Sequence, residues 1–138
     1  MWRSYALLSA LFAALTALFA KIGVRGIDSG LATAIRTTVV LLLSWGIACA
    51  AGSLHELRAI GRTSWTFLVL SGLATGLSWL CYFKALSLGD VSRVAPIDKL
   101  SVVFAIVLAC VVLKEPVTPR VLLGGALIVA GSIVLLLK

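Results

Sequence analysis

Long apolar runs alternate with short polar breaks along the whole chain. The runs predict helices over residues 2–20, 29–51, 65–88, 91–113 and 120–137. Each is close to the roughly 20 residues that an α-helix needs to cross a bilayer. No period-2 alternation is present, which argues against a membrane β-barrel. The pattern predicts an all-α membrane protein with five transmembrane helices in a single domain, residues 1–138.

The first apolar run imitates a secretory signal peptide because Arg3 precedes it. Cleavage requires small residues shortly before the cut, and Leu15 and Leu18 occupy those positions. We therefore expect this run to remain as the first membrane helix. In the turn that follows, Ser29 is the expected N-cap of the second helix.

The composition agrees with a membrane protein, since 62% of the 138 residues are hydrophobic and only 12% are charged. A soluble domain usually carries about twice that share of charge. The net charge is +7, but the basic residues are scattered at helix ends, which argues against nucleic-acid binding. The cysteines (Cys49, Cys81, Cys110) lie in apolar runs and are expected to be small packing residues.

No set of residues for catalysis or metal binding is visible in the sequence. The single histidine, His55, lies in the polar break 52–64 without neighbouring ligands, so we expect no metal site. There is no Ser–His–Asp or Cys–His set and no Gly-rich phosphate loop before a helix. We therefore expect neither enzymatic activity nor a cofactor, which leaves a transporter, a channel or a structural membrane subunit.

The fourth apolar run begins with the most unusual polar residues of the chain. Asp98 and Lys99 lie side by side within it, shortly after Pro96. Charge inside a bilayer costs several kcal/mol unless it is paired or hydrated. Pro96 has no N–H, so the carbonyl of Ser92 loses its helical partner and can face a cavity. Pro96 is therefore the predicted helix-breaking residue.

The deep charges are predicted to share one half of the bilayer. If the helices alternate in direction, one membrane face carries Lys21, Arg36, Lys84, Asp98 and Lys99. Four of these side chains are cationic, and such a pocket suits an anionic or zwitterionic ligand. The candidate substrate-binding residues are Arg36, Lys99, Asp98, Lys84, Trp79 and Tyr82.

Structural roles for the same charges stay open. Lys21 and Lys84 can extend their ammonium groups to the membrane interface, and Asp98 can neutralise Arg36 or Lys99. Adjacent residues on a helix point about 100° apart, which favours Arg36 over Lys99 as the partner of Asp98.

The aromatic residues and the threonines also have alternative roles. Trp79 and Tyr82 can belong to an interfacial aromatic belt or can line a substrate path. Thr33 and Thr37 flank Arg36 on the same helical face and can share its hydrogen bonds.

The last helix has a face of small residues that includes Gly124, Gly125 and Gly131. Small residues allow membrane helices to approach closely. We expect these glycines to pack against the same helix of a second copy, the alternative being packing within one chain.

The order and spacing of several motifs resemble the EamA-like family of the drug/metabolite transporter superfamily. The motifs are Lys21, Arg36, YFKALSLGDVSRVAPI at 82–97, LKEP at 113–116 and GGALIVAGSIVLLL at 124–137. Members usually carry two five-helix repeats, so the resemblance implies a ten-helix carrier that works by alternating access. This chain holds one repeat, which implies a homodimer. It also has Asp98 and Lys99 where members are mostly apolar, so the family's substrates do not transfer directly.

An odd number of helices places the two ends of one repeat on opposite membrane faces, so consecutive repeats are inverted. Two copies of this chain reproduce that arrangement only in opposite orientations. With Arg36 and Lys99 set aside, the basic residues divide equally between the faces. They are Arg3, Arg58, Arg62, Lys114 and Arg120 against Lys21, Arg25, Lys84, Arg93 and Lys138. This balance selects neither orientation, whereas counting Lys21 and Lys84 as intramembrane favours the N-terminus inside.

The sequence thus predicts a multi-pass transporter of the bacterial inner membrane that moves a small anionic or zwitterionic metabolite as an antiparallel homodimer. One alternative is an efflux pump like the small multidrug resistance proteins, which need an acidic residue in the first helix. No acid occurs in residues 2–20. The other alternative is an accessory membrane subunit that transports nothing.

Overall fold

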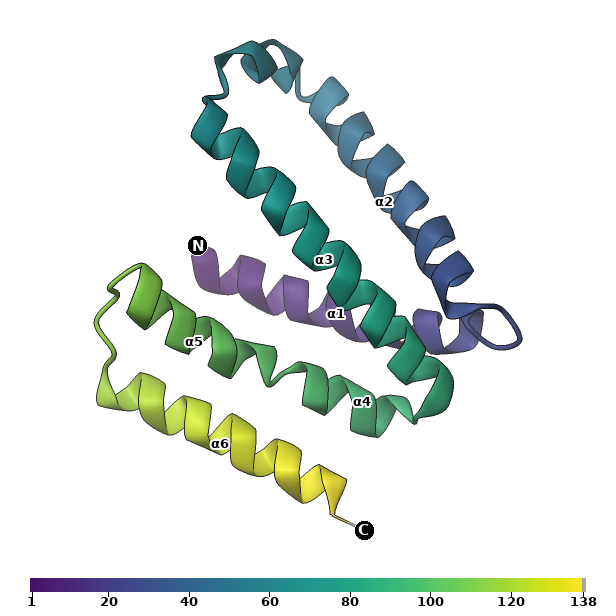
Figure 1. The fold of residues 1–138 in the computed structure, drawn as a ribbon, viewed down its shortest axis with the longest axis vertical. Helices are drawn as coiled ribbons and strands as arrows, with labels where there is room; N and C mark the ends of the chain where they lie inside the picture. Colours follow the sequence, from purple (N-terminus) through teal and green to yellow (C-terminus); the bar gives the residue numbers. More distant parts are fainter. Residues whose placement is uncertain (138) are drawn as a thin grey trace. The chain divides into compact units, whose positions relative to one another are not determined.

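The computed structural model describes residues 1–137, and its secondary structure is helical with no strand in this range (Figure 1). The elements are α1 (Trp2–Gly23), α2 (Ser29–Ala50), the 3-10 helix η1 (Ser53–Ala59), α3 (Arg62–Leu88), α4 (Val91–Asp98), α5 (Ser101–Val112) and α6 (Pro119–Leu136). Over the described residues, five segments are long and apolar enough to span a membrane, α4 and α5 together forming one of them. The predicted all-α fold with five candidate membrane helices is confirmed over the described residues. Lys138, which the charge balance includes, lies outside the described residues.

Four of the predicted helices agree with the structure to within three residues at each end. The predicted cap of α2 is wrong, because Asp28 rather than Ser29 fills that role. The Oδ2 atom of Asp28 accepts hydrogen bonds from the backbone N–H groups of Gly30 at 2.8 Å and Leu31 at 3.0 Å. A carboxylate at this position also stabilises the positive end of the helix dipole.

The fourth predicted helix, 91–113, is not continuous. Lys99 and Leu100 form a turn between α4 and α5. There the N–H of Lys99 donates to the carbonyl of Pro96 at 3.1 Å, and the N–H of Leu100 donates to that of Ile97 at 2.9 Å. These bonds join residues three apart, while the N–H of Lys99 also donates to the carbonyl of Ala95, four residues earlier, at 3.3 Å. The break follows Pro96, whose missing N–H already interrupts the helical hydrogen bonds one turn earlier.

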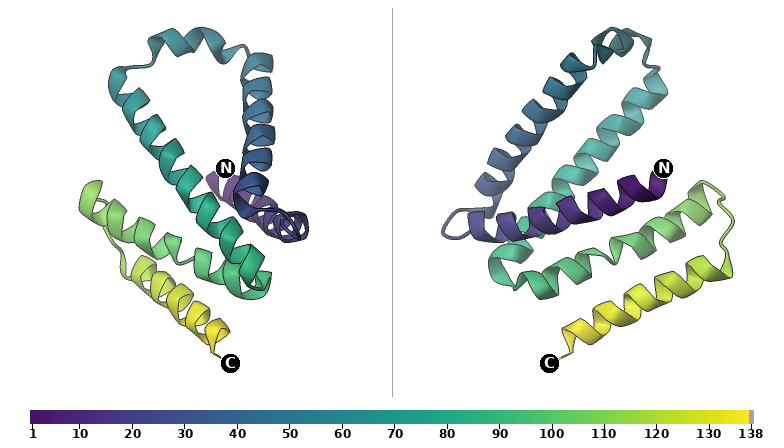
Figure 2. Two further views of the ribbon diagram at one scale, coloured as in Figure 1. Left: turned by 45° about the vertical axis from the view of Figure 1, so that its right-hand side comes forward. Right: turned by 180° about the vertical axis from the view of Figure 1, so that it is seen from behind.

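The chain forms two compact units. The first unit, Phe19–Ser87, contains the end of α1 and the pair α2 and α3, which η1 connects (Figure 2). The second unit contains Met1–Leu18 and the chain from Leu88 onward. In it, α6 runs antiparallel to α4 and α5 and packs along both (Figures 1 and 2).

Most large apolar side chains face outward. Leu42 of α2 is 68% exposed and Phe67 of α3 is 67% exposed, whereas Leu86 is fully buried. In water, such exposure would cost about 25 cal/mol per Å² of apolar surface. In a bilayer the cost vanishes, because lipid tails are as apolar as the side chains. The surface therefore suits lipid or a partner protein rather than water.

The three glycines of α6 do not share one environment. Gly125 is buried, and a Cβ atom built on it would lie 3.7 Å from the Cδ1 atom of Ile106 on α5. No atom would lie within 4 Å of a Cβ atom on Gly124 or Gly131. Gly125 thus packs within the chain, while the packing of Gly124 and Gly131 against a second copy stays a prediction.

We expect Gly125→Leu to loosen the contact between α5 and α6 by overpacking, at a cost of about 1–3 kcal/mol. Gly125→Ala should be tolerated, because its Cβ would make an ordinary contact. Thermal unfolding in detergent measures the effect, with Gly46→Leu in α2 as control because that position is open. Equal melting temperatures for Gly125→Leu and the wild type would contradict this packing.

Candidate functional site

An arginine stacked on aromatic rings connects α2 and α3. The guanidinium carbon of Arg36 lies 4.0 Å from the centroid of the Trp79 ring and 5.5 Å from that of Phe83. Trp79 and Phe83 are four residues apart on α3, so both rings lie on one helix face. Cation–π attraction reaches about 2 kcal/mol when water is excluded, so the cluster stabilises the pairing of α2 with α3.

Arg36 is the eighth residue of α2, about 10 Å from its first residue at 1.5 Å per residue. Within the described unit Phe19–Ser87, no carboxylate forms an ion pair with Arg36. Stacking uses the flat face of the guanidinium and leaves the N–H donors at its edge for another ligand. Paired donors of this kind match the two oxygens of a carboxylate or phosphate.

The two threonines beside Arg36 use their hydroxyl protons within α2. The hydroxyl of Thr33 donates to the carbonyl of Ser29 at 2.7 Å, and that of Thr37 donates to the carbonyl of Thr33 at 2.7 Å. Each bond is local, because a Thr hydroxyl in a helix readily reaches the carbonyl four residues earlier. Among the described residues no hydrogen bond joins either threonine to Arg36, so the two threonines do not share its hydrogen bonds.

Lys21, in the last turn of α1, forms a hydrogen bond with the end of α3. Its Nζ atom donates to the carbonyl of Leu86 at 2.7 Å. The last four carbonyls of a helix have no helical partner, and a lysine can satisfy one of them.

Two other candidate residues lie on α3. Lys84 is exposed. The ring of Tyr82 meets that of Phe83 edge to face, with 6.5 Å between the ring centroids.

In the second unit, Asp98 and Lys99 interact with each other. The Nζ atom of Lys99 lies 3.9 Å from Oδ2 of Asp98, and the Lys99 and Asp98 side chains are 58% and 40% exposed. This contact is too long for a hydrogen bond, so the pair is held by charge alone. The predicted pairing of Asp98 with Arg36 would join two different units and stays a prediction.

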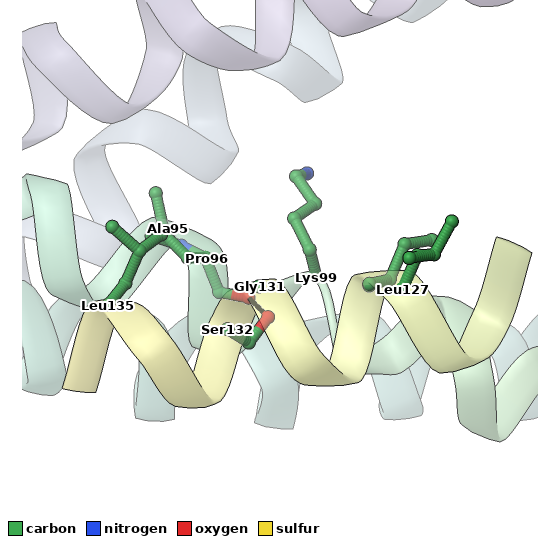
Figure 3. A pocket seen from close by; sticks show the side chains of 8 residues that line it. Ala95, Pro96, Lys99, Leu127, Gly131, Ser132 and Leu135 are labelled. Atoms are coloured by element: carbon green, nitrogen blue, oxygen red, sulfur yellow. Dashed lines mark hydrogen bonds between the residues drawn. The ribbon is translucent and has the colours of Figure 1, made fainter. Parts of the chain in front are cut away.

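An open cavity of about 400 Å³ lies between α4 and α6, next to this pair (Figure 3). Its lining consists of Ala95, Pro96, Lys99, Leu127, Ile128, Gly131, Ser132 and Leu135. The Ser132 hydroxyl donates to the carbonyl of Pro96 at 3.1 Å and ties α6 to α4. In Figure 3 the ammonium end of Lys99 stands clear of the other labelled side chains. The cavity thus combines one cationic side chain with a mostly apolar lining.

Two residues of these clusters are not among the predicted site residues. Phe83 belongs to the aromatic group after Gly76, and its spacing of four from Trp79 is the signal that could have placed both rings against one neighbour. Ser132 is a single hydroxyl in an apolar helix, which is a weak signal, and only the structure shows its bond to Pro96.

Comparison with known proteins gives two matches of nearly full length. The model of the EamA-like transporter family matches residues 1–137. A protein of Sinorhizobium sp, named "Uncharacterized transporter in cobO 3'region", is 51% identical over 134 residues, which cover 97% of this chain and 95% of that protein. No solved structure matches.

Proposed function

Because this chain belongs to the EamA-like transporter family, we propose that it is a secondary transporter for a small anionic or zwitterionic metabolite. Its apolar helices make it a multi-pass membrane protein, and we assign it to the bacterial inner membrane. The observation that carries the proposal is the position of Arg36, a stacked guanidinium whose N–H edge has no carboxylate partner in its own unit.

Arg36 would bind the anionic group of the substrate. A cation within the membrane is costly when unpaired, and a substrate carboxylate or phosphate offsets that cost on binding. Trp79 and Phe83 would hold the guanidinium plane in place, so that both oxygens of the anion are met by paired N–H donors. Tyr82, Lys84, Lys99 and Asp98 remain candidates for further substrate contacts.

The working form would be an antiparallel homodimer with alternating access. One chain supplies a single five-helix repeat, and two inverted copies would supply the ten helices of a complete carrier. The balanced distribution of basic residues permits both orientations. The extensive exposed apolar surface of each chain provides area for a partner as well as for lipid.

A ligand screen tests the anionic substrate class. Purified protein is heated with pairs of compounds, each a carboxylate and its uncharged amide, because binding to the native state raises the melting temperature. We expect stabilisation by acids and not by their amides. Equal stabilisation by both members of every pair would contradict a site built on Arg36.

Substitution of the two glycines of α6 that have no neighbour within 4 Å of a built Cβ atom tests the dimer. Gly124→Leu and Gly131→Leu should lower the dimer fraction in detergent, since added bulk prevents close approach of two helices. Light scattering over a range of protein concentrations measures that fraction, and Gly46→Leu is the matched control. Intact dimers from both variants would refute packing through α6.

A further inference from the structure

Asp98 is the one carboxylate of this sequence that lies inside a membrane-spanning segment. The other acidic residues lie outside those segments; they are Asp28, Glu56, Asp90 and Glu115. Asp98 is the eighth residue of the span Val91–Val112, about 10 Å along it at 1.5 Å per residue. A carboxylate at such depth is typical of ion or proton pathways.

Lys99 is the charged group that faces Asp98 in its unit. On α4 the other charged residue is Arg93, more than one helical turn earlier, and α5 carries no charged residue. The residues of α6 that line the cavity are uncharged, and Arg120 lies at the far end of that helix from Leu135. Within this unit, the charge beside the cavity therefore depends on Asp98 and Lys99.

Protonation of Asp98 would change the net charge of this pair from zero to +1. When Asp98 is ionised, its carboxylate competes with an incoming anion for the ammonium of Lys99, whose Nζ atom lies 3.9 Å from Oδ2 of Asp98. When Asp98 carries a proton, the ammonium remains as an unpaired cation at the edge of a cavity whose other lining residues are uncharged. A proton on Asp98 and an anion on Lys99 would thus favour each other's binding.

We propose that the cavity between α4 and α6 binds a small organic anion with an apolar body, together with one proton on Asp98. A proton from water adds to a carboxylate oxygen of Asp98, the ion pair with Lys99 breaks, and the anionic group pairs with the Lys99 ammonium. The apolar body lies against Pro96 and Leu127. Release reverses both steps. Because the anion and the proton carry opposite charges, their joint binding adds no net charge to the site.

The dimensions and depth of the cavity favour a small ligand over a lipid headgroup. Its volume of about 400 Å³ falls within the range of small-molecule sites. Lys99 lies about 12 Å along its span, well inside the hydrocarbon region of roughly 30 Å, whereas lipid phosphates lie outside that region. A soluble anion that enters the protein can reach this depth. The inference goes beyond the proposed function, in which Arg36 binds the substrate anion, because it assigns a second anion-binding site that is linked to a proton.

Calorimetry with benzenesulfonate tests the linkage, because this anion keeps its charge over the pH range used. The full chain in discs of zwitterionic lipid is titrated with benzenesulfonate at about pH 5 and about pH 8. Wild-type affinity should rise as the pH falls, by at most about tenfold per pH unit for one linked proton. Uncharged benzenesulfonamide should show no such dependence.

Variants of the pair assign the effect to residues. Asp98→Asn should bind benzenesulfonate with the high affinity of acidic pH at both pH values, and Asp98→Glu should keep the pH dependence. Lys99→Met should lose binding at both pH values. A wild-type affinity independent of pH, the same dependence in Asp98→Asn, or unchanged binding by Lys99→Met would each overturn the proposal.

Two further outcomes would also overturn it. No binding of benzenesulfonate at either pH would exclude an organic-anion site, and its displacement by anionic lipid in the discs would assign the cavity to lipid. The proposed transport function fails by a different readout, which is the absence of solute uptake into vesicles containing the protein. Binding to discs requires no transport, so the two failures are distinguishable.

Discussion

Arg36→Ala should abolish uptake and leave the dimer folded. Loss of the guanidinium removes the paired donors for the substrate anion, and removal of one partner from a desolvated charge pair costs about 3 kcal/mol, or roughly a hundredfold in affinity. Arg36→Lys should keep part of the binding, because the charge survives while the planar pair of donors is lost. Uptake into vesicles and ligand-induced thermal stabilisation measure both effects.

A second cationic residue controls for general damage to the membrane domain. Arg62 is exposed at the start of α3 and is not a candidate substrate contact, so Arg62→Ala should change uptake far less than Arg36→Ala. The loss of stacking in Arg36→Ala should lower stability by about 1–2 kcal/mol, which thermal unfolding reports separately from uptake.

The double variant Arg36→Ala with Asp98→Ala separates substrate binding from a structural ion pair. If the two residues only neutralise each other, the double variant should recover the uptake that either single change destroys. If Arg36 binds substrate, the double variant should stay inactive. A double-mutant cycle on uptake and on stability gives the coupling between them. Full recovery would mean that the substrate site lies elsewhere.

Fixing the orientation of the chain should inactivate it, and mixing two orientations should restore activity. Two lysines added within residues 58–62 would favour one orientation, and two added within residues 24–27 would favour the other. Each variant expressed alone should lose most of its uptake, because it lacks inverted partners. Their co-expression should restore uptake. Two variants that failed to fold could not restore uptake together, so recovery would exclude a folding defect as the cause of the loss.

Tags at the C-terminus provide the reference for this experiment. In the wild type, tags should be found on both sides of the membrane in comparable amounts, as the balanced basic residues predict. A wild-type C-terminus found on one side alone would rule out the antiparallel dimer. Full activity of either charge variant by itself would do the same.

The helices were predictable because a membrane span is specified by length and apolarity, which are both local properties of the sequence. The position of the break was less predictable. Pro96 marks the weakened helix, but the turn occurs at Lys99 and Leu100, where the backbone hydrogen bonds change spacing. The cap of α2 was misassigned because Asp28 and Ser29 are both good capping residues, and only the observed bonds distinguish them.

The sequence singles out candidate site residues but does not give their contacts. Arg36 stands out because charge is rare within an apolar helix, and Trp79 because it lies near other aromatics. Periodicity places each side chain on a face of its own helix but does not determine which face of a neighbouring helix it meets. The stacking of Arg36 on Trp79 therefore required the structure.

The outward-facing side chains have a consequence for how this sequence can diverge. Where a leucine such as Leu42 or Leu122 meets lipid, replacement by isoleucine, valine or phenylalanine leaves its surroundings nearly unchanged, because fluid lipid adapts to any apolar shape. Buried Leu86, Thr33 and Ser132 have no such freedom, since fixed protein atoms surround them. Relatives can therefore drift far in overall identity while a small number of inward-facing positions keeps the same chemistry.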